Sequence, residues 1–179
     1  MRYLLIAAVL AVGNVMPPAP GITVSEDRGV YSVVARFDVP APPPVALAVL
    51  TDYEQIPRFM PGVKTSVVQE RGNGRAVVEQ EAVSKFMMFS KRVHLILDIS
   101  EKEDALSFRD RCRKSFARYE GEWRMTARSS GTELTYSLTA EPSFDVPGFI
   151  LRRLLERDSK DMIEQLRGEI ARRGGRPAL

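Results

Sequence analysis

The feature that most constrains the fold is a succession of segments with period-two alternation between residues 63 and 140. In such a segment, every second side chain points to the same face of a strand. Three segments show the pattern most clearly, with apolar faces formed by Val93, Leu95, Leu97 and Ile99, by Tyr119, Trp123 and Met125, and by Leu134, Tyr136 and Leu138. Their opposite faces are mainly charged or hydroxylated, which is typical of an antiparallel sheet with one dry and one hydrated face.

Turn residues divide this region into strands. Asn73-Gly74 supplies the positive φ angles of a tight hairpin turn. An earlier segment rich in β-branched and aromatic residues also reads as a strand. We therefore expect strands at 30–39, 63–70, 75–85, 92–100, 105–112, 118–127 and 132–140.

The dry face of this sheet needs a cover, and the sequence offers one long helix. Residues 45–53 and 54–60 predict two short helical segments, the second interrupted by Pro57. Residues 149–173 predict a helix whose apolar stripe comprises Leu151, Leu154, Leu155, Met162, Leu166 and Ile170. The prediction is an α+β fold in which this C-terminal helix lies against the sheet.

The N-terminus is typical of a targeting segment. Arg2 precedes an apolar run at 3–12, and a Pro-rich stretch follows at 17–20. Ten apolar residues suit the core of a signal peptide and are short for a membrane span. We expect residues 1–20 to be a signal peptide and linker and the protein to be exported to the periplasm, with the segment cleaved or kept as a membrane tether. The alternative is a buried helix of the fold.

Composition excludes several classes of site. The net charge is only +3, from 26 Lys and Arg against 23 Asp and Glu, which does not indicate nucleic-acid binding. A single Cys and a single His allow no intramolecular disulfide and no Cys/His zinc site. There is no Gly-rich phosphate loop. We therefore expect no metal, no cofactor and no nucleic-acid partner.

With these elements in order, the chain resembles the START-like, polyketide cyclase/dehydrase-like superfamily (SRPBCC, Bet v 1-like). The resemblance spans 28–173 and is carried by LTDYEQIPRFMPGV (50–63), YEGEWRM (119–125), GTELTYSL (131–138) and PGFILRRLLERDSKDMIEQLRGEI (147–170). Within the superfamily the chain is most similar to the coenzyme Q-binding and ribosome-association-toxin branch.

The resemblance implies a helix-grip fold. In it a curved antiparallel sheet of about seven strands wraps the C-terminal helix, and two short helices follow the first strand. Beyond the resemblance, we expect residues 174–179 to be a disordered tail. Many members bind or carry apolar molecules, and a minority are enzymes. We expect an exported carrier of a quinone, polyprenoid or lipid, with no catalytic residues. The alternatives are a cyclase/dehydrase-type enzyme on a polyketide-like substrate and a protein-interaction module.

A ligand cavity is expected between the dry face and the helix. Its candidate residues are Tyr119, Trp123, Tyr136, Leu95, Leu97, Phe108, Leu155, Asp158 and Met162. Asp158 interrupts the apolar stripe, and a buried carboxylate has to be paired or protonated. Either it reaches water or pairs with Arg109 or Arg111, or it holds the head group of a ligand.

The segment at 85–92 is expected to form a turn at the mouth of this cavity. Four large apolar residues, Phe86, Met87, Met88 and Phe89, precede the cations Lys91 and Arg92. Met is adaptable and suits an apolar entrance, and the cations suit an anionic membrane. The alternative is that the segment only folds over a neighbouring loop.

Other reactive side chains are given structural roles. His94 shares its face with Arg92 and Asp98, whereas Cys112 is in phase with the dry face, so a nucleophilic dyad is rejected. For Asp52-Tyr53-Glu54, the resemblance implies a structural role, which is to close the short helices against the sheet. Basic residues at both ends of the last helix form either a solvated face or a contact with anionic lipid: Arg152, Arg153, Arg157, Arg167, Arg172 and Arg173.

Overall fold

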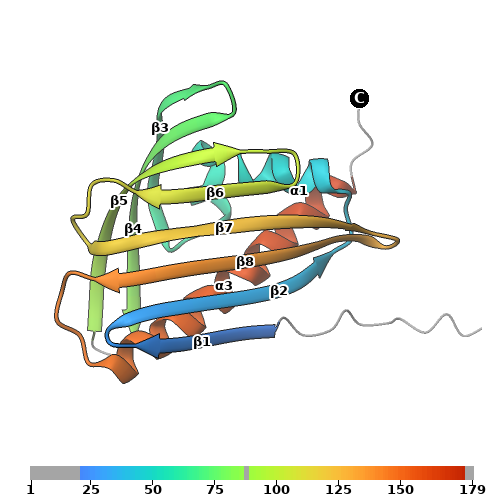
Figure 1. The fold of residues 1–179 in the computed structure, drawn as a ribbon. Coiled ribbons are helices and arrows are strands. Elements are labelled where there is room, and N and C mark those ends of the chain that lie inside the picture. The colour runs from blue at the N-terminus through green and yellow to red at the C-terminus, as the bar shows by residue number, and fades with distance from the viewer. Residues whose placement is uncertain (1–20, 87–88, 176–179) are drawn as a thin grey trace, which may run out of the picture.

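One antiparallel sheet curves around a long helix in the computed structural model, which describes residues 21–86 and 89–175 (Figure 1). The strand order is β1-β2-β8-β7-β6-β5-β4-β3. The strands are β1 (Gly21–Asp27), β2 (Val30–Val39), β3 (Val63–Gly72), β4 (Arg75–Phe86), β5 (Phe89–Glu101), β6 (Ala105–Asp110), β7 (Phe116–Arg128) and β8 (Gly131–Pro142). The expected α+β helix-grip architecture is confirmed.

The sheet has eight strands, so the expectation of about seven missed one. The additional strand is β1, which pairs with β2 through a tight turn at Arg28 and Gly29, where φ is 50° and 81°. Only one residue of β1, Val24, is buried. An edge strand with so little buried surface has a weak period-two pattern, so residues 21–27 were assigned to neither the linker nor the domain.

Short helices connect β2 to the far edge of the sheet. They are α1 (Pro43–Leu50), the 3₁₀ helix η1 (Tyr53–Gln55) and α2 (Ile56–Phe59). Proline opens α1, where its fixed φ and missing N–H are tolerated. The expected helix at 45–53 therefore begins two residues earlier and ends at Leu50. Together these helices close one end of the concave face (Figure 1).

The long helix α3 (Gly148–Gly174) lies across the concave face of the sheet (Figure 1). It contacts β1, β2, β4 and α1. Its buried positions are Leu151, Leu154, Ser159, Ile163, Leu166, Glu169 and Ile170. At the centre of the predicted stripe, the buried residue is Ile163 rather than Met162. Leu155, Asp158 and Met162 are half-buried.

An ionic cluster fixes the C-terminal end of α3. Glu169 accepts hydrogen bonds from Arg172 and Arg173, and Arg173 also pairs with Asp52 at 2.8 Å, which ties the helix to the segment after α1. The Arg172 guanidinium, with Arg173 beside it, lowers the pKa of Glu169 to about 2. The Asp52 carboxylate thus has a structural role, as the sequence suggested.

Gly121 marks a place where the curved sheet leaves no room for a side chain. A Cβ at this position would lie 2.2 Å from the Ser137 carbonyl oxygen and 2.6 Å from the Phe108 ring. Phe108 pairs directly with Gly121 in the β6–β7 register. Because the glycine has no side chain, the Phe108 ring can cover the strand at the concave face.

Strands β4 and β5 extend further than the sequence indicated. They pair up to Phe86 and Phe89, so the broad turn expected across 85–92 is wrong, and only Met87 and Met88 lie between the strands. Those two methionines lie outside the described residues, and the apolar lip of Phe86 to Phe89 stays a prediction. The signal peptide at 1–20 and residues 176–179 of the tail also lie outside them, whereas Gly174 still belongs to α3. No helix within 21–86 and 89–175 is long and apolar enough to cross a membrane.

Candidate functional site: an interior cavity

A partly open cavity of about 130 Å³ lies between the sheet and the helices. The sheet supplies one wall, and α1, η1, α2 and α3 supply the other. The lining residues are Val49, Leu50, Tyr53, Ile56, Phe59, Met60, Gln80, Leu97, Ile99, Leu106, Phe108, Tyr119, Trp123, Tyr136, Met162 and Leu166.

Aromatic rings dominate the sheet wall because the inward positions of three adjacent strands carry them. Phe108 on β6 stacks on Tyr136 of β8 with ring centroids 6.4 Å apart, and Tyr136 packs against Trp123 of β7 at 4.4 Å. Tyr119 lies one inward position beyond Gly121, 6.0 Å from Phe108. This arrangement offers flat, polarizable surfaces to anything held in the cavity.

Two tyrosine hydroxyls supply polarity in the cavity wall. The Tyr119 and Tyr136 hydroxyls interact with each other. Because a hydroxyl both donates and accepts, the pair keeps one proton for a further acceptor. Burial raises the pKa of Tyr119 to about 12 and holds the pKa of Tyr136 well above its ordinary value. Both groups are therefore neutral hydrogen-bond donors at physiological pH and poor bases.

Tyr53 and Gln80 are the other polar groups of the lining, and both have partners. The Tyr53 hydroxyl donates to Glu101 at 2.8 Å, and burial together with this bond raises the Tyr53 pKa. The Gln80 amide donates to Ser66 at 3.1 Å. Among the described residues that line the cavity, none is an Asp, Glu, His, Lys or Arg. The arrangement suits binding better than proton transfer.

Most of the predicted cavity residues meet at this cavity. Its lining includes Tyr119, Trp123, Tyr136, Leu97, Phe108 and Met162. Leu95 is buried in the core, and Leu155 is half-buried against it, but neither contributes to the lining.

Asp158 also lies away from the cavity lining. Its carboxylate accepts hydrogen bonds from Ser84 on β4 and from Arg157, and its side chain is 42% exposed. The suggested pairing with Arg109 or Arg111 is wrong, because Arg109 pairs with Glu120 and Arg111 with Asp98 on the opposite face of the sheet. Asp158 thus joins α3 to β4 near the cavity.

The sequence analysis missed the contribution of the short helices. Leu50, Tyr53, Ile56 and Phe59 recur every third residue, a spacing that places them on one helical face. That spacing could have identified them as a wall of the cavity. The short helices were instead expected to close against the sheet and to stand at the mouth of the cavity, and none of their residues was assigned to its wall.

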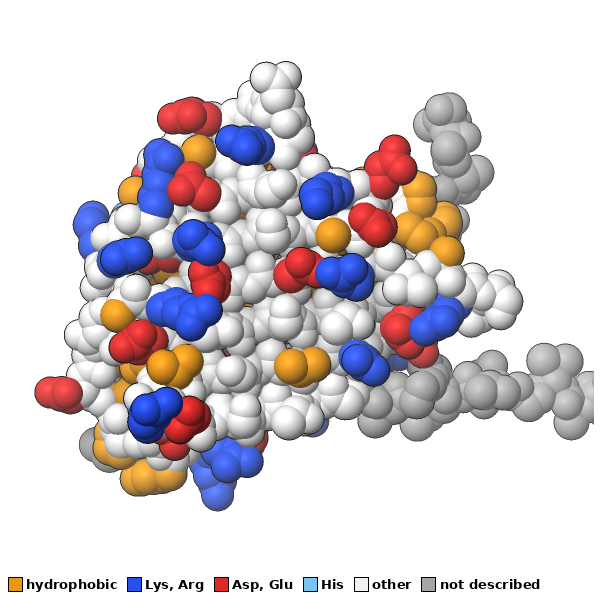
Figure 2. Space-filling view, in the orientation of Figure 1, with side chains coloured by type: hydrophobic (Ala, Val, Ile, Leu, Met, Phe, Trp, Pro, Cys, Tyr) orange, Lys and Arg blue, Asp and Glu red, His pale blue; other side chains and the backbone are white. Residues whose placement is uncertain are grey.

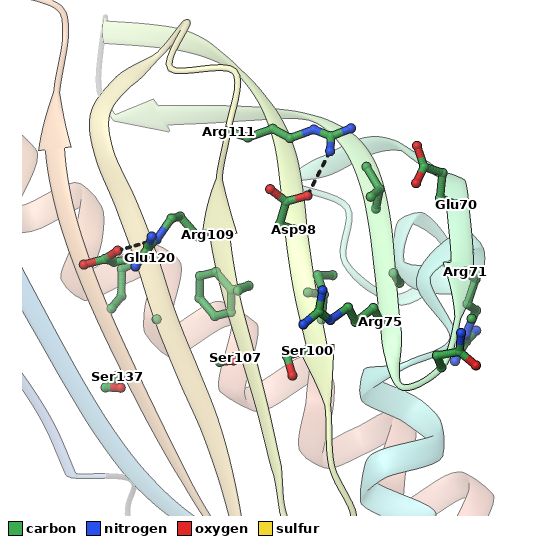
Figure 3. A pocket seen from close by; sticks show the side chains of 18 of the residues that line it. Glu70, Arg71, Arg75, Asp98, Ser100, Ser107, Arg109, Arg111, Glu120 and Ser137 are labelled. Carbon is green, nitrogen blue, oxygen red and sulfur yellow. Dashed lines mark hydrogen bonds and ion pairs between the residues drawn. The ribbon is translucent and has the colours of Figure 1, made fainter.

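A larger hollow, of about 1250 Å³, lies on the outer face of the sheet and is open to solvent (Figure 3). Two ion pairs cross its strands. Arg109 lies 2.9 Å from Glu120, and Arg111 lies 3.1 Å from Asp98. The floor also carries the hydroxyls of Ser100, Ser107 and Ser137, away from the two ion pairs. Paired charges and small hydroxyls are typical of a solvated face, so this groove is a weaker candidate than the cavity.

His94 lies on the outer side of the sheet, as expected. Its imidazole is 3.4 Å from Glu79 and 3.8 Å from Glu81. The Cys112 thiol points toward the His94 backbone carbonyl oxygen, 3.7 Å from it, rather than toward the imidazole. No group of three or more His, Cys, Asp or Glu in the described part of the chain could hold a metal ion.

Comparison with family models gives one match. The model described as polyketide cyclase / dehydrase and lipid transport matches residues 39–167, which include the short helices, most of the sheet and most of α3. Comparison with curated proteins gives no match.

Solved structures share the fold at low sequence identity. A protein of Thermus thermophilus is 24% identical, with a TM-score of 0.64, and the match covers 79% of this chain and 95% of that one. The Zhui aromatase/cyclase of Streptomyces sp. R1128 is 17% identical, with a TM-score of 0.67 and coverage of 80% and 95%. A STAR-related lipid transfer protein of Xanthomonas axonopodis is 16% identical, with a TM-score of 0.64 and coverage of 84% and 98%.

Proposed function

The chain belongs to the polyketide cyclase/dehydrase and lipid transport family, and from this premise we propose that it binds a small lipophilic molecule in the cavity between the sheet and α3. A molecule with a flat ring system and one or more oxygen atoms, such as a quinone, fits the lining best. A polyprenoid or an acyl lipid would use the same apolar walls.

The observation that carries this proposal is the composition of the cavity wall. Ligand sites are mainly apolar and aromatic, with a few placed polar groups. Here aromatic and aliphatic side chains surround the hydroxyls of Tyr119 and Tyr136, and the lining within the described residues carries no formal charge. An apolar ring would stack on Trp123 or Phe108 while a carbonyl or hydroxyl oxygen accepts a hydrogen bond from the Tyr119 or Tyr136 hydroxyl.

The size of the cavity adds a requirement. Sites for drug-sized ligands measure about 300–1,000 Å³, whereas this cavity measures about 130 Å³. A larger ligand therefore has to displace part of the wall. Phe59, Met60 and Met162 are half-buried, and α2 spans only four residues, so this side of the wall moves at the lowest energetic cost.

An aromatase or cyclase activity is the second candidate, because solved structures with this fold include such enzymes. Proton transfer during cyclisation needs an acid and a base with pKa values near the operating pH. The cavity supplies hydroxyls whose pKa values are raised, with that of Tyr119 at about 12. Binding or carriage is therefore the better supported function.

We further propose that the protein works outside the cytoplasm. The support is the sequence of residues 1–20, with Arg2, the apolar run and the Pro-rich stretch. N-terminal sequencing of the protein from a fractionated cell tests this point. A mature chain that begins beyond residue 13 in the exported fraction supports it, and an intact Met1 in the cytoplasmic fraction contradicts it.

The binding proposal is tested by fluorescence. Trp123 is the only tryptophan of the chain and lines the cavity. Titration with a small naphthoquinone, with a medium-chain fatty acid and with a sugar of similar mass should show saturable quenching or enhancement for one or both lipophilic compounds and no response to the sugar. The absence of a saturable response to every lipophilic compound would contradict the proposal.

A further inference from the structure

We propose that the end of the molecule formed by the first turns of α3 and the paired ends of β4 and β5 is a docking face for an anionic lipid bilayer. This inference goes beyond ligand binding, and its failure would leave the proposed cavity function intact. It rests on an exposed aromatic side chain, on the cations around it and on the unusual start of α3.

The apolar part of this face is centred on Phe149. Its side chain is 68% exposed, the largest fraction among the exposed large hydrophobic residues of the described chain. Pro147 and Gly148 beside it are also exposed. Hydrophobic side chains gather at this end of the molecule, at the lower left of Figure 2, with Lys and Arg side chains close by.

Both elements of this face carry cations. Arg152 and Arg153 are exposed on the next turn of α3, and Lys85 is exposed at the end of β4. Lys91, near the start of β5, lies 4.2 Å from the centre of the Phe144 ring in the segment before α3. That contact places the two elements side by side, as Figure 1 also shows. Opposing charges are fewer: Glu156 pairs with Arg152, and Asp145 is exposed.

The start of α3 departs from the pattern that stabilises a helix. Helix N-termini favour acidic residues and a side-chain cap, because the first N–H groups carry partial positive charge. Here the cap position is Pro147, which makes no side-chain cap bond, and the first turn has no acidic residue. Arg152 and Arg153 follow instead. An anionic surface would compensate this concentration of positive charge.

The extent of the face favours a bilayer over a second copy of the chain. Stable protein interfaces bury about 1,200–2,000 Å², and a single exposed aromatic side chain with its flanking backbone falls far short of this. Peripheral membrane contact needs only a small inserted apolar group and several cations. Each Lys or Arg near an anionic leaflet strengthens partitioning by about fivefold, which is the equivalent of about 1 kcal/mol.

The test places a tryptophan at the proposed point of contact. The full-length Phe149→Trp variant is mixed with vesicles of phosphatidylcholine alone or with one quarter phosphatidylglycerol, each prepared with and without brominated acyl chains. Quenching by the brominated lipid reports on the depth of the indole, and wild-type protein supplies the background from Trp123. This readout does not depend on whether residues 3–12 also bind the vesicles.

Two matched controls accompany this variant. Val34→Trp places an indole at an exposed position on β2. The second control is a comparison of two double charge reversals, both made in the Phe149→Trp chain. Lys85→Glu with Arg153→Glu changes the proposed face, and Arg36→Glu with Arg75→Glu changes another part of the surface. The second pair replaces exposed cations of β2 and β4 elsewhere on the molecule and changes the net charge equally.

The proposal predicts that anionic vesicles quench the indole of Phe149→Trp at least threefold more than the indole of Val34→Trp, and that neutral vesicles quench it weakly. The first pair of reversals should abolish this quenching, and the second should leave most of it. Equal quenching in the two tryptophan variants, no quenching in either, or equal losses from both pairs of reversals would overturn the proposal. A dimer in sedimentation experiments that is lost on Phe149→Ser would overturn it in favour of a second copy.

Discussion

At the scale of single residues, the Tyr119–Tyr136 pair gives the cavity its directional chemistry. The two hydroxyls interact, so one proton of the pair remains to be offered to a ligand. We predict that Tyr119→Phe weakens the binding of a ligand with a carbonyl oxygen by about two- to tenfold. The free energy of unfolding should fall by about 1–3 kcal/mol, because the buried Tyr136 hydroxyl loses its partner.

Titration of Trp123 fluorescence and urea denaturation measure the two effects. Tyr31→Phe, at a buried tyrosine of β2 that does not line the cavity, is the control and should leave ligand affinity unchanged. An equal loss of affinity in both variants would assign the effect to general stability rather than to the hydroxyl pair.

The carboxylate of Glu169 makes the free energy of unfolding depend on pH. Because its pKa in the folded protein is about 2, below the ordinary value of 4.5, the folded state favours the ionised carboxylate. Its stabilising contribution is therefore complete above about pH 4.5 and is lost as the pH falls toward 2. We predict that Glu169→Gln lowers the free energy of unfolding at pH 7 and that its difference from wild type shrinks between pH 4.5 and 2.

Urea denaturation of both proteins at several pH values checks this prediction. Wild-type and Glu169→Gln curves that fall in parallel with pH would show that the Arg172 and Arg173 contacts contribute no pH-dependent stability. The Arg173–Asp52 pair remains in the variant, so the connection between α3 and α1 is weakened rather than removed.

At the scale of elements, the curvature of β7 against β6 and β8 decides the shape of the cavity. Gly121→Ala would place a methyl group 2.2 Å from a backbone oxygen of β8. Since backbone cannot move as a side chain can, we predict destabilisation of about 3 kcal/mol or more, at the upper end of the overpacking range. Thermal melting measures it. Gly72→Ala, where the added carbon meets no atom within 4 Å, is the control, and similar losses in the two variants would contradict the packing argument.

The contact between α3 and the sheet sets the capacity of the cavity. Met162→Ala removes a flexible side chain from the wall, and we predict a larger cavity at a stability cost of about 2 kcal/mol, the low end for Met→Ala because the residue is only half-buried. Affinity for a two-ring ligand should rise relative to that for a one-ring ligand. If this ratio did not change in parallel titrations, Met162 would not limit ligand size.

At the scale of the whole molecule, the sequence predicts the architecture because each level of the pattern agrees. The alternation that includes Leu95 and Leu97 predicts a sheet with one dry face, and the Asn73-Gly74 turn predicts that its strands pair as a hairpin. The 3.6-residue apolar period of α3 predicts the helix that covers this face. The inward phases assigned to Trp123 and Tyr136 are confirmed, since both are buried. Burial on a strand follows from alternation alone, so these side chains needed no tertiary information.

Where the sequence analysis failed, the determining contact is not local. β1 is held by pairing with β2 rather than by its own buried surface. The partner of Asp158 is Ser84, 74 residues away. Met162 lines the cavity and Leu155 does not. This difference depends on the rotation of α3 about its axis relative to the sheet. The apolar period of a helix does not fix that rotation to within one residue.

The most direct test of cavity binding is native mass spectrometry of the purified full-length chain with a lipophilic ligand. Leu106 and Ser107 are neighbours on β6, but Leu106 lines the cavity and Ser107 lies on the outer face. Thermal melting first establishes that Leu106→Trp and Ser107→Trp are both folded. We predict one ligand per chain in wild type and in Ser107→Trp, and loss of that ligand in Leu106→Trp, whose indole fills the cavity. Equal ligand retention in the two variants, or no ligand on the wild-type chain, would contradict the central claim.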